Sequence, residues 1–370
     1  MKHLILLGGG HAHVHVLRAL AANPLPETRV MLVSPYARQM YSGMVPGLIA
    51  GHYRADQCVI PLKPLALAGK VSFVEASATA IDTGKRSVTL SDGRSAGYDV
   101  LSIDTGPVMD RIRLAGAREH ALAVRPIERF VSLFGEVVAL AQSRVVDIVV
   151  IGAGAAGVEL ALAMQHRFSR GGIERARVSL VTGGDAPLSG YSDAVRRRAA
   201  TQLARQRVTV FQAACLGLTR DQVLLPGGMC VASDVAVLAT GTVAPLWLRD
   251  SGLALDANGF IATGETLQSV SHPEVFAVGD VASRVDAPHP KSGVYAVRSG
   301  PPLAENLRKF FLGQSLQSHH PQLRTLNLIS LGRRSALASW GPFTLQGRLM
   351  WWWKDAIDRG FIARYTDTID

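Results

Sequence analysis

The sequence is poor in cysteine: only three occur in 370 residues, at Cys58, Cys215 and Cys230. So few and so scattered cysteines exclude the disulfide framework that is typical of small secreted proteins. They also form no closely spaced pair of the kind that a disulfide-based redox centre needs. The composition therefore favours a reducing compartment. We expect a cytoplasmic protein in which each cysteine serves as a small buried apolar residue.

Long apolar runs and a leader segment are lacking as well. No stretch of about 18 uninterrupted apolar residues occurs, so no membrane-spanning helix is expected. The chain starts a predicted strand after two residues without a charged leader, so export is not expected either. The formal net charge is +10, but the arginines are widely spread, and the cluster at 196–207 is best explained as a solvated helix face. With no basic tail, RNA-stacking motif or zinc pattern, no nucleic-acid partner is expected.

What the sequence does contain is an alternation of apolar strands and helices over a length that predicts two or three domains. A strand–turn–helix–strand pattern covers 4–33 and again 147–182, with further strands at 208–212 and 235–239. Other strands are predicted at 71–81, 87–90, 98–103 and 275–278, and helices at 127–143, 192–207 and 294–311. The irregular stretch 36–64 is long enough to line a site. Residues 326–370 predict two short strands and a tryptophan-rich helix.

A complete glycine-rich turn opens the second of these patterns. Gly152, Gly154 and Gly157 follow an apolar strand and begin an apolar helix, as in the G-x-G-x-x-G turn that binds dinucleotides. The first glycine allows the tight bend, the second lets a pyrophosphate approach the backbone, and the third lets helix and strand pack closely. The phosphates then lie at the positive end of the helix dipole. The turn therefore predicts a nucleotide site.

The first pattern opens with an incomplete turn. Gly8 and Gly10 fit, but His13 stands in place of the third glycine, where its side chain would push helix and strand apart or swing outward. We expect His11 to lie near the phosphates. Because alternating histidines point in different directions as a helix begins, His11, His13 and His15 predict no metal site.

Neither pattern has the acidic residue that usually binds the adenosine ribose at the end of the second strand. Ser34 holds that place in the first pattern and can bind a ribose hydroxyl as a neutral partner. Thr182, Gly183 and Gly184 follow the strand in the second. The choice between NADH and NADPH therefore stays open, with Asp185 near enough to favour NADH.

Four further segments carry a resemblance to a known family. The strand that ends in Thr105-Gly106 and the strand that ends in Thr240-Gly241 resemble the two A-T-G strands of flavoproteins that bind two dinucleotides. Gly279-Asp280 resembles their flavin-binding G-D motif, and Pro301 opens a helix that meets the flavin in these proteins. Together the motifs resemble the pyridine nucleotide-disulfide oxidoreductase superfamily. The chain is similar there to type II NADH dehydrogenases and sulfide:quinone reductases. Segments 8–13 and 41–47 are most similar to a subgroup often fused ahead of selenophosphate synthetase.

The resemblance implies FAD on the first module and NADH or NADPH on the second. The residues that it assigns to FAD are Gly8, Gly10, His11, His13, Ser34, Pro46, Ala78, Thr105, Gly106, Gly279, Asp280 and Pro301. The residues that it assigns to the nicotinamide nucleotide are Gly152, Gly154, Gly157, Glu159, Thr240 and Gly241.

Two charged residues are candidates for a catalytic role. Glu159 matches the family glutamate near the nicotinamide, whereas its alternative role is that of a helix surface charge. Lys291, together with Arg298, could neutralise reduced flavin or attract an anionic substrate, and its alternative is again a surface charge. Flavin supplies the redox chemistry, so the lack of a catalytic triad or metal cluster agrees with this interpretation.

The predicted function is an FAD-dependent NAD(P)H dehydrogenase that reduces a quinone or another small acceptor without a redox-active disulfide. Two alternatives stay open: a flavoprotein of sulfur or selenium metabolism, which would need a reactive Cys58, and a non-catalytic nucleotide-binding redox sensor. Arg298 and Ser299 stand where quinone-reducing relatives have amide side chains, which leaves the acceptor open.

The predicted fold is α/β, with two Rossmann-like domains, one inserted in the other, and a small C-terminal α+β domain. The boundaries are 1–110 and 242–325 for the FAD domain, 111–241 for the NAD(P)H domain and 326–370 for the last. In the final helix, Met350, Trp353, Ile357 and Phe361 fall on one stripe. That stripe predicts packing on the chain's own sheet or a second subunit, with peripheral membrane binding at the inner face as the alternative. A homodimer and an association with selenophosphate synthetase are the remaining partner predictions.

Overall fold

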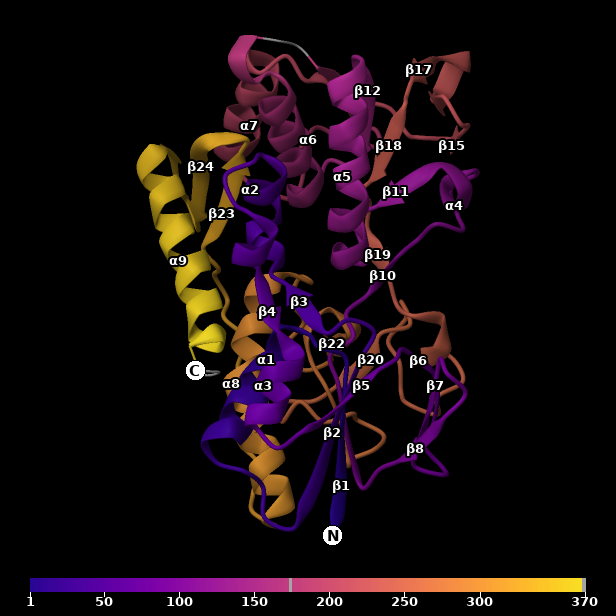
Figure 1. Cartoon of the computed structure of the whole chain (residues 1–370), viewed down its shortest axis with the longest axis vertical. Coiled ribbons are helices and arrows are strands. Elements are labelled where there is room, and N and C mark those ends of the chain that lie inside the picture. The colour runs from indigo at the N-terminus through magenta and orange to yellow at the C-terminus, as the bar shows by residue number, and fades with distance from the viewer. Residues whose placement is uncertain (173–174, 368–370) are drawn as a thin grey trace.

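The computed structural model describes residues 1–172 and 175–367, and two parallel sheets organise it (Figure 1). The first has the strand order β21-β9-β1-β2-β5, with every neighbouring pair parallel. Because later strands add on both sides of β1, its carboxyl end is the topological switch point at which open α/β sheets bind ligands. The bounds are β1 (Lys2–Leu7), β2 (Thr28–Ser34), β5 (Ser72–Glu75), β9 (Val100–Ile103) and β21 (Val275–Ala277).

The two faces of this sheet pack against different partners. Leu4 and Leu6 of β1 belong to a core with the helices α1 (His11–Ala22), α3 (Leu62–Ala68) and α8 (Gly293–Phe311). Ile5 and Leu7 point the other way, into a core with the antiparallel sheet of β6 (Ala78–Asp82), β7 (Ser87–Leu90) and β8 (Ser95–Gly97). This alternation follows from the two-residue period of a strand, and it explains why β1 is apolar throughout.

The second sheet repeats the same plan. Its order is β11-β18-β12-β13-β14, all parallel, with β12 in the middle. A second three-stranded antiparallel sheet, β15 (Gly217–Leu218), β16 (Gln222–Leu224) and β17 (Cys230–Ala232), accompanies it. The other bounds are β11 (Ala121–Ala123), α5 (Ile127–Ser143), β12 (Val146–Ile151), α6 (Ala155–Phe168), β13 (Ala176–Val181), α7 (Asp193–Arg205), β14 (Thr209–Phe211) and β18 (Val235–Leu238). The α/β class predicted from the sequence is confirmed.

The glycine turns of the two sheets face each other. In Figure 1, β1 runs upward from the N-terminus, so the first turn lies at the upper edge of the lower sheet. In the upper sheet, β18 leads down to β19 (Thr242–Val243), and β12 is parallel to β18, so the second turn lies at the lower edge of that sheet. The chain crosses between the sheets through the antiparallel pair β10 (Val108–Met109) and β19 (Thr242–Val243).

Segment 36–64, which the sequence predicts to be irregular, lies between the two sheets. It consists of short elements: β3 (Arg38–Met40), the 3-10 turn η1 (Ser42–Met44), α2 (Val45–Ile49), η2 (Ala55–Cys58) and β4 (Val59–Pro61). In Figure 1, α2 lies against α6, and β4 lies beside α9 (Arg348–Thr366). A guanidinium–carbonyl hydrogen bond of 3.4 Å from Arg167 of α6 to Ile49 fixes one of these contacts.

The C-terminal unit differs from its prediction in two respects. It has three antiparallel strands, β23 (Asn327–Leu331), β24 (Arg333–Trp340) and β25 (Phe343–Gly347), rather than two, followed by α9 (Arg348–Thr366). The prediction that the stripe of α9 packs on the chain's own sheet is also wrong for Trp353 and Ile357, which are about half exposed, whereas Phe361 is buried. The buried side is formed by the positions Trp351, Lys354, Asp358, Phe361, Ile362 and Tyr365.

A buried ion pair explains this reversal. Lys354 Nζ lies 2.6 Å from Asp358 and also donates a hydrogen bond of 2.6 Å to the backbone carbonyl of Gly43. Such a pair tolerates burial only when further hydrogen bonds complete it, and Gly43 supplies one. Turning the pair inward places Trp352 and Trp353 at the surface. Among the described residues, no helix combines the length and apolar character needed to cross a bilayer.

Candidate dinucleotide site

The first glycine turn joins β1 to α1 under tight steric limits. Gly8 has φ of +93°, and a Cβ there would lie 2.4 Å from the carbonyl oxygen of Asp104 at the end of β9. Only glycine meets both conditions. The turn leads directly into α1 at His11, so the free N–H groups at the start of that helix point toward the carboxyl edge of the sheet. This is the arrangement that binds phosphate groups.

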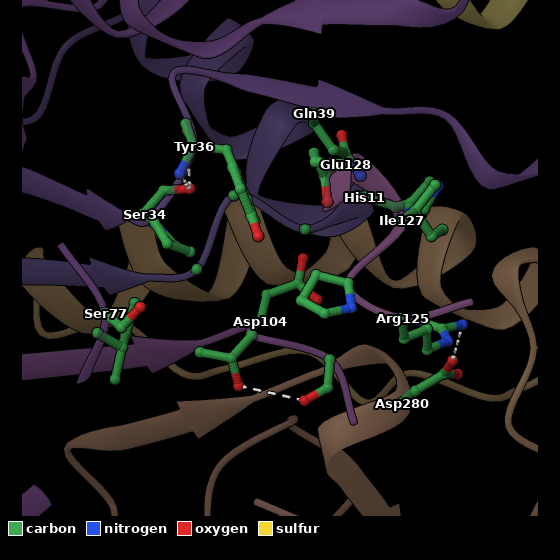
Figure 2. A pocket seen from close by; sticks show the side chains of 18 of the residues that line it. His11, Ser34, Tyr36, Gln39, Ser77, Asp104, Arg125, Ile127, Glu128 and Asp280 are labelled. Atoms are coloured by element: carbon green, nitrogen blue, oxygen red, sulfur yellow. Dashed lines mark hydrogen bonds and ion pairs between the residues drawn. The ribbon is translucent and has the colours of Figure 1, made fainter. Parts of the chain in front are cut away.

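A cavity of about 340 Å³ extends along this edge (Figure 2). Figure 2 shows Ser34 and Ser77 toward one end and the Arg125–Asp280 ion pair toward the other, with Asp104 between them. Gln39 also lines the cavity, and its buried Oε1 has no hydrogen-bond partner. An elongated space with a helix terminus at its middle fits a dinucleotide, whose pyrophosphate lies between two ring systems. The predicted FAD residues that line it are Gly8, Gly10, His11, Ser34, Ala78, Thr105, Gly106 and Asp280.

Asp104, which the sequence analysis did not single out, lies at the centre of this wall. Its Oδ2 accepts hydrogen bonds from the backbone N–H groups of Ala12 at 2.9 Å and His13 at 3.0 Å. The side chain is buried, and desolvation raises its pKa to about 8. A Cβ at Gly10 would lie 2.3 Å from its Cγ, and one at Gly279 would lie 2.8 Å from its Oδ1. Both glycines therefore leave room for this carboxyl group.

His13 turns inward, which neither sequence expectation foresaw. Its Nδ1 lies 2.6 Å from the carbonyl oxygen of Gly8, and its Nε2 lies 2.8 Å from Ser102 Oγ. The imidazole thus fills the space between helix and turn instead of swinging outward. Burial lowers its pKa to about 4, so the ring is neutral near pH 7. His13 does not line the cavity, and its position indicates a structural role.

His11 does line the cavity, as predicted. Its ring packs edge-on against Tyr41, with 5.5 Å between ring centroids. Desolvation and the nearby positive charge of Arg125 lower its pKa to about 4. His11 is therefore neutral near pH 7 and would face a ligand in this cavity as both a hydrogen-bond donor and an acceptor.

Asp280 and Ser34 both line the cavity but already have partners. Asp280 pairs with Arg125 at 3.2 Å, although the two are 155 positions apart in the sequence. The Ser34 hydroxyl donates to the carbonyl oxygen of Tyr36 at 3.0 Å and can still accept one hydrogen bond from a ribose. Arg125 was missed by the sequence analysis because nothing nearby in the sequence marks it.

Besides His13, four residues predicted to lie near the flavin are outside the cavity wall. Pro46 is buried within α2, and Pro301 lines a separate cleft with His15 between α1 and α8. Gly279 supports Asp104 instead of facing the cavity. Lys291 donates a hydrogen bond of 2.6 Å to the carbonyl oxygen of Ala282, and its Nζ lies 3.8 Å from the centroid of the Phe260 ring. These placements give no support to the predicted flavin contacts of the prolines or to a catalytic Lys291.

The second glycine turn is packed tightly at its first and third glycines and open at its second. Gly152 has φ of +112°, and a Cβ there would lie 2.4 Å from the carbonyl oxygen of Ala239 and 2.9 Å from the nitrogen of Thr240. A Cβ at Gly157 would lie 1.7 Å from the carbonyl oxygen of Gly152. Gly154 is exposed, and a Cβ there would meet nothing within 4 Å, so a ligand can approach its backbone. Gly241 follows Thr240 at the surface.

Glu159 is one turn into α6 and faces the C-terminal unit. Its Oε1 accepts a hydrogen bond of 2.7 Å from the backbone N–H of Ser330 on β23. Desolvation raises its pKa to about 7, and the positive charge of Lys354 opposes that rise. Glu159 is thus a half-buried carboxyl group bonded to the C-terminal unit, and not the helix surface charge of the alternative interpretation.

Cys58, the cysteine of the first module, is poorly placed for thiol chemistry. The prediction that every cysteine is buried is wrong for Cys230, which is exposed. All three are free. Cys58 is completely buried, its thiol donates to the carbonyl oxygen of Arg54 at 3.5 Å, and burial raises its pKa to about 12. A thiol so rarely ionised is a poor nucleophile.

Fold and site together define an α/β protein with two glycine-rich turns, of the type that binds dinucleotides, that face each other. A family model for pyridine nucleotide-disulphide oxidoreductases matches residues 2–300. The chain belongs to this family, whose members are FAD- and NAD(P)-dependent oxidoreductases.

Individual relatives agree with this membership. The chain is 24% identical to the Bacillus subtilis NADH dehydrogenase-like protein YutJ over 368 residues, covering 96% of this chain and 99% of that protein. It is 22% identical to the Staphylococcus aureus type II NADH:quinone oxidoreductase, covering 85% and 84% of the two chains.

Solved structures show the same fold. The sulfide:quinone oxidoreductase of Aquifex aeolicus superimposes with a TM-score of 0.82 at 19% identity, covering 100% of this chain and 92% of that one. NDH2 from Plasmodium falciparum in complex with NADH superimposes with a TM-score of 0.83 at 12% identity, covering 99% and 98%.

Proposed function

We propose that the protein is an FAD-dependent NAD(P)H dehydrogenase that passes electrons to a quinone or another small acceptor, without a redox-active disulfide. The observation that carries the proposal is the cavity at the first glycine turn, placed opposite a second, fully formed turn. The names of the NADH dehydrogenase-like relatives support the electron donor, and those of the quinone-reducing relatives support the acceptor.

The first module would hold FAD through its own backbone. The amides that follow Gly8 and Gly10 would bind the pyrophosphate, and Asp280 would accept a hydrogen bond from the ribityl chain. Arg125, now paired with Asp280, places a positive charge at the same end of the cavity. Bound FAD would supply hydride acceptance and one-electron chemistry, while the residues around it supply position and electrostatics.

The second module would hold NADH or NADPH at Gly152–Gly157. Thr182 occupies in this sheet the place that Ser34 has in the first, and its buried hydroxyl has no hydrogen-bond partner. That hydroxyl is a candidate for the adenosine ribose. Glu159, whose pKa of about 7 lets it hold or release a proton, lies at the start of the same helix. Both features leave the choice between NADH and NADPH to experiment.

The decisive experiment is anaerobic stopped-flow of the flavin-loaded protein against NADH and NADPH. Bleaching of the flavin absorbance by either nucleotide would support the dehydrogenase proposal, and the faster one identifies the donor. Reoxidation by a quinone, by polysulfide or by selenium compounds then distinguishes the acceptor classes. A protein that binds no FAD, or whose flavin neither nucleotide reduces, would contradict the proposal, and the second outcome would favour a redox sensor.

We also propose that α9 attaches the protein to an anionic membrane surface. Leu349, Trp352, Trp353 and Ile357 share one exposed face of this helix. The arginines at 333, 334 and 348 are exposed around its amino end, and the whole chain carries a net charge of +10. Tryptophan and leucine beside arginine are typical of helices that lie in the interface of an anionic bilayer.

Sedimentation with vesicles tests this attachment. The protein should sediment with vesicles that contain phosphatidylglycerol and much less with pure phosphatidylcholine. The double variant Trp352→Ser/Trp353→Ser should lose binding by about tenfold, since each tryptophan buries substantial area. Leu67→Ser, at an exposed leucine on α3, is the control. Equal sedimentation of all three proteins would refute the attachment, and a change from dimer to monomer in the double variant would show that a second copy covers the helix.

The remaining sequence predictions are kept as proposals. We divide the chain into an FAD domain (1–110 and 242–325), an NAD(P)H domain (111–241) and a C-terminal unit (326–370), a division that the separate sheets support. A homodimer, a cytoplasmic location with peripheral attachment at the inner face of the membrane, and an association with selenophosphate synthetase are kept as the sequence and its resemblance predict them.

A further inference from the structure

The carboxyl group of Asp104 binds some of the free backbone N–H groups at the amino end of α1. The first amides of this helix, after Gly10, are the groups that a pyrophosphate would use. The N–H groups of Ala12 and His13, the next in line, are already bonded to Asp104 Oδ2. The carboxyl group also lines the cavity, so it faces the ligand as well as the helix.

The charge around Asp104 gives it little compensation. His11 and His13 of α1 are neutral near pH 7, because burial lowers the pKa of each to about 4. Asp280, on the turn Gly279–Val281 after β21, adds a negative charge, and the guanidinium of Arg125 is committed to Asp280. A pyrophosphate at the same helix end would bring further negative charge against a carboxylate that is shielded from water. Like charges in such a place cannot all be ionised.

The second glycine turn has no carboxyl group at the position of Asp104. Ala239 stands at the position of Asp104, since Gly152 packs against the Ala239 carbonyl as Gly8 packs against the Asp104 carbonyl. The helix end at Gly154 is thus left entirely to its ligand. Asp104 is therefore a particular property of the first module and not a requirement of the turn.

We propose that Asp104 and the FAD pyrophosphate share the amino end of α1, a proposal that rests on the proposed function. Asp104 is then held as the neutral acid whenever FAD is bound. FAD binding is then coupled to proton uptake by Asp104 at any pH at which the free protein carries it as a carboxylate. Asp104 acts here as a positioning residue that organises the first turn of α1 and tunes cofactor affinity.

Cofactor affinity as a function of pH tests the coupling. FAD dissociation from the full chain is followed by recovery of flavin fluorescence on dilution, between pH 6 and 9.5. Because burial raises the pKa of Asp104 to about 8, the Kd for FAD should be flat at low pH and should rise toward tenfold per pH unit above about pH 8. Asp104→Asn, a neutral isostere that keeps an acceptor for the two amides, should give a flat profile and bind FAD about tenfold more tightly than wild type at pH 9.

The control is Asp99→Asn, an exposed carboxylate just before the opposite end of β9, which should keep the wild-type profile. A flat wild-type profile, or an unchanged rise in Asp104→Asn, would overturn the proposal. So would an Asp104→Asn protein that is folded yet loses FAD at every pH, since Asp104 would then be needed as an anion.

A second measurement applies if the variant does not fold. Calorimetry of the wild-type chain with FAD at pH 8.5, in two buffers of different ionisation enthalpy, should show net proton uptake. The absence of proton uptake would overturn the coupling. Failure to bind FAD at all would instead contradict the proposed function.

Discussion

The two glycine turns of this protein have the same backbone plan but use different side chains to hold it. In the second turn, Gly157 lets α6 rest directly on the carbonyl of Gly152. In the first, the imidazole of His13 stands between α1 and the carbonyl of Gly8 and hydrogen-bonds to it. The comparison shows that the third glycine of the pattern is one solution to a packing problem. A buried, neutral imidazole that satisfies the same carbonyl is another.

The largest effect is expected where the turn has no spare room. Gly157→Ala would place Cβ 1.7 Å from a backbone oxygen that cannot move aside. Such overpacking should cost about 3 kcal/mol, lower the thermal unfolding midpoint by roughly 5–10 °C and abolish NADH binding. Gly135→Ala on the exposed side of α5, where a Cβ meets nothing within 4 Å, is the matched control and should be neutral or slightly stabilising. Equal melting shifts in both variants would show that the close contact is not decisive.

A somewhat smaller loss is expected at the first turn. His13→Ala would leave a void and remove hydrogen bonds to Gly8 and Ser102, at a cost of about 2–3 kcal/mol. His13→Gly, which restores the usual glycine, should be no more stable than His13→Ala. The midpoint of thermal unfolding measures both, with exposed His3→Ala as the control. A His13→Gly protein as stable as wild type would refute the view that the imidazole is structural.

The sequence predicts the structural features of the two modules that depend on local residue patterns. It predicts both βαβ units and a helix at 127–143 that matches α5. It misses Asp104, although aligning the two internal strands that end in Thr-Gly would have shown an acid opposite Ala239. It misses the inward face of α9, because apolar periodicity cannot reveal that Gly43, some 300 positions away, is available to complete the Lys354–Asp358 pair. Long-range partners of polar groups are decided by tertiary packing.

The two modules should also differ in how pH affects them. Burial raises the folded-state pKa of Glu159 from 4.5 to about 7, so the folded protein binds this proton more tightly than the unfolded one. Its stabilising contribution is therefore present below about pH 4.5 and is lost as the pH rises through 7. Glu159→Gln should remove roughly 2 kcal/mol of that pH dependence between pH 5 and 8. Denaturant titrations at several pH values would show this, and Glu136→Gln, at an exposed residue of α5, should leave the slope unchanged.

The smallest effect is expected at the single cysteine of the first module. Cys58→Ala should change the rate of flavin reduction and reoxidation less than twofold, because the thiol is buried and its pKa is raised to about 12. A stability loss of about 1 kcal/mol is expected from the small void. Exposed Cys230→Ala is the control in the other module. Loss of turnover in Cys58→Ala alone would favour the sulfur or selenium alternative.

The most direct test of the account is whether the two turns serve two nucleotides that exchange electrons. Flavin-loaded wild-type protein and Gly157→Ala are each mixed with NADH, and then with dithionite, without oxygen. The account predicts that NADH bleaches the flavin of the wild type only, while dithionite bleaches both. A wild-type flavin that NADH leaves oxidised, or equal bleaching of both proteins by NADH, would contradict it.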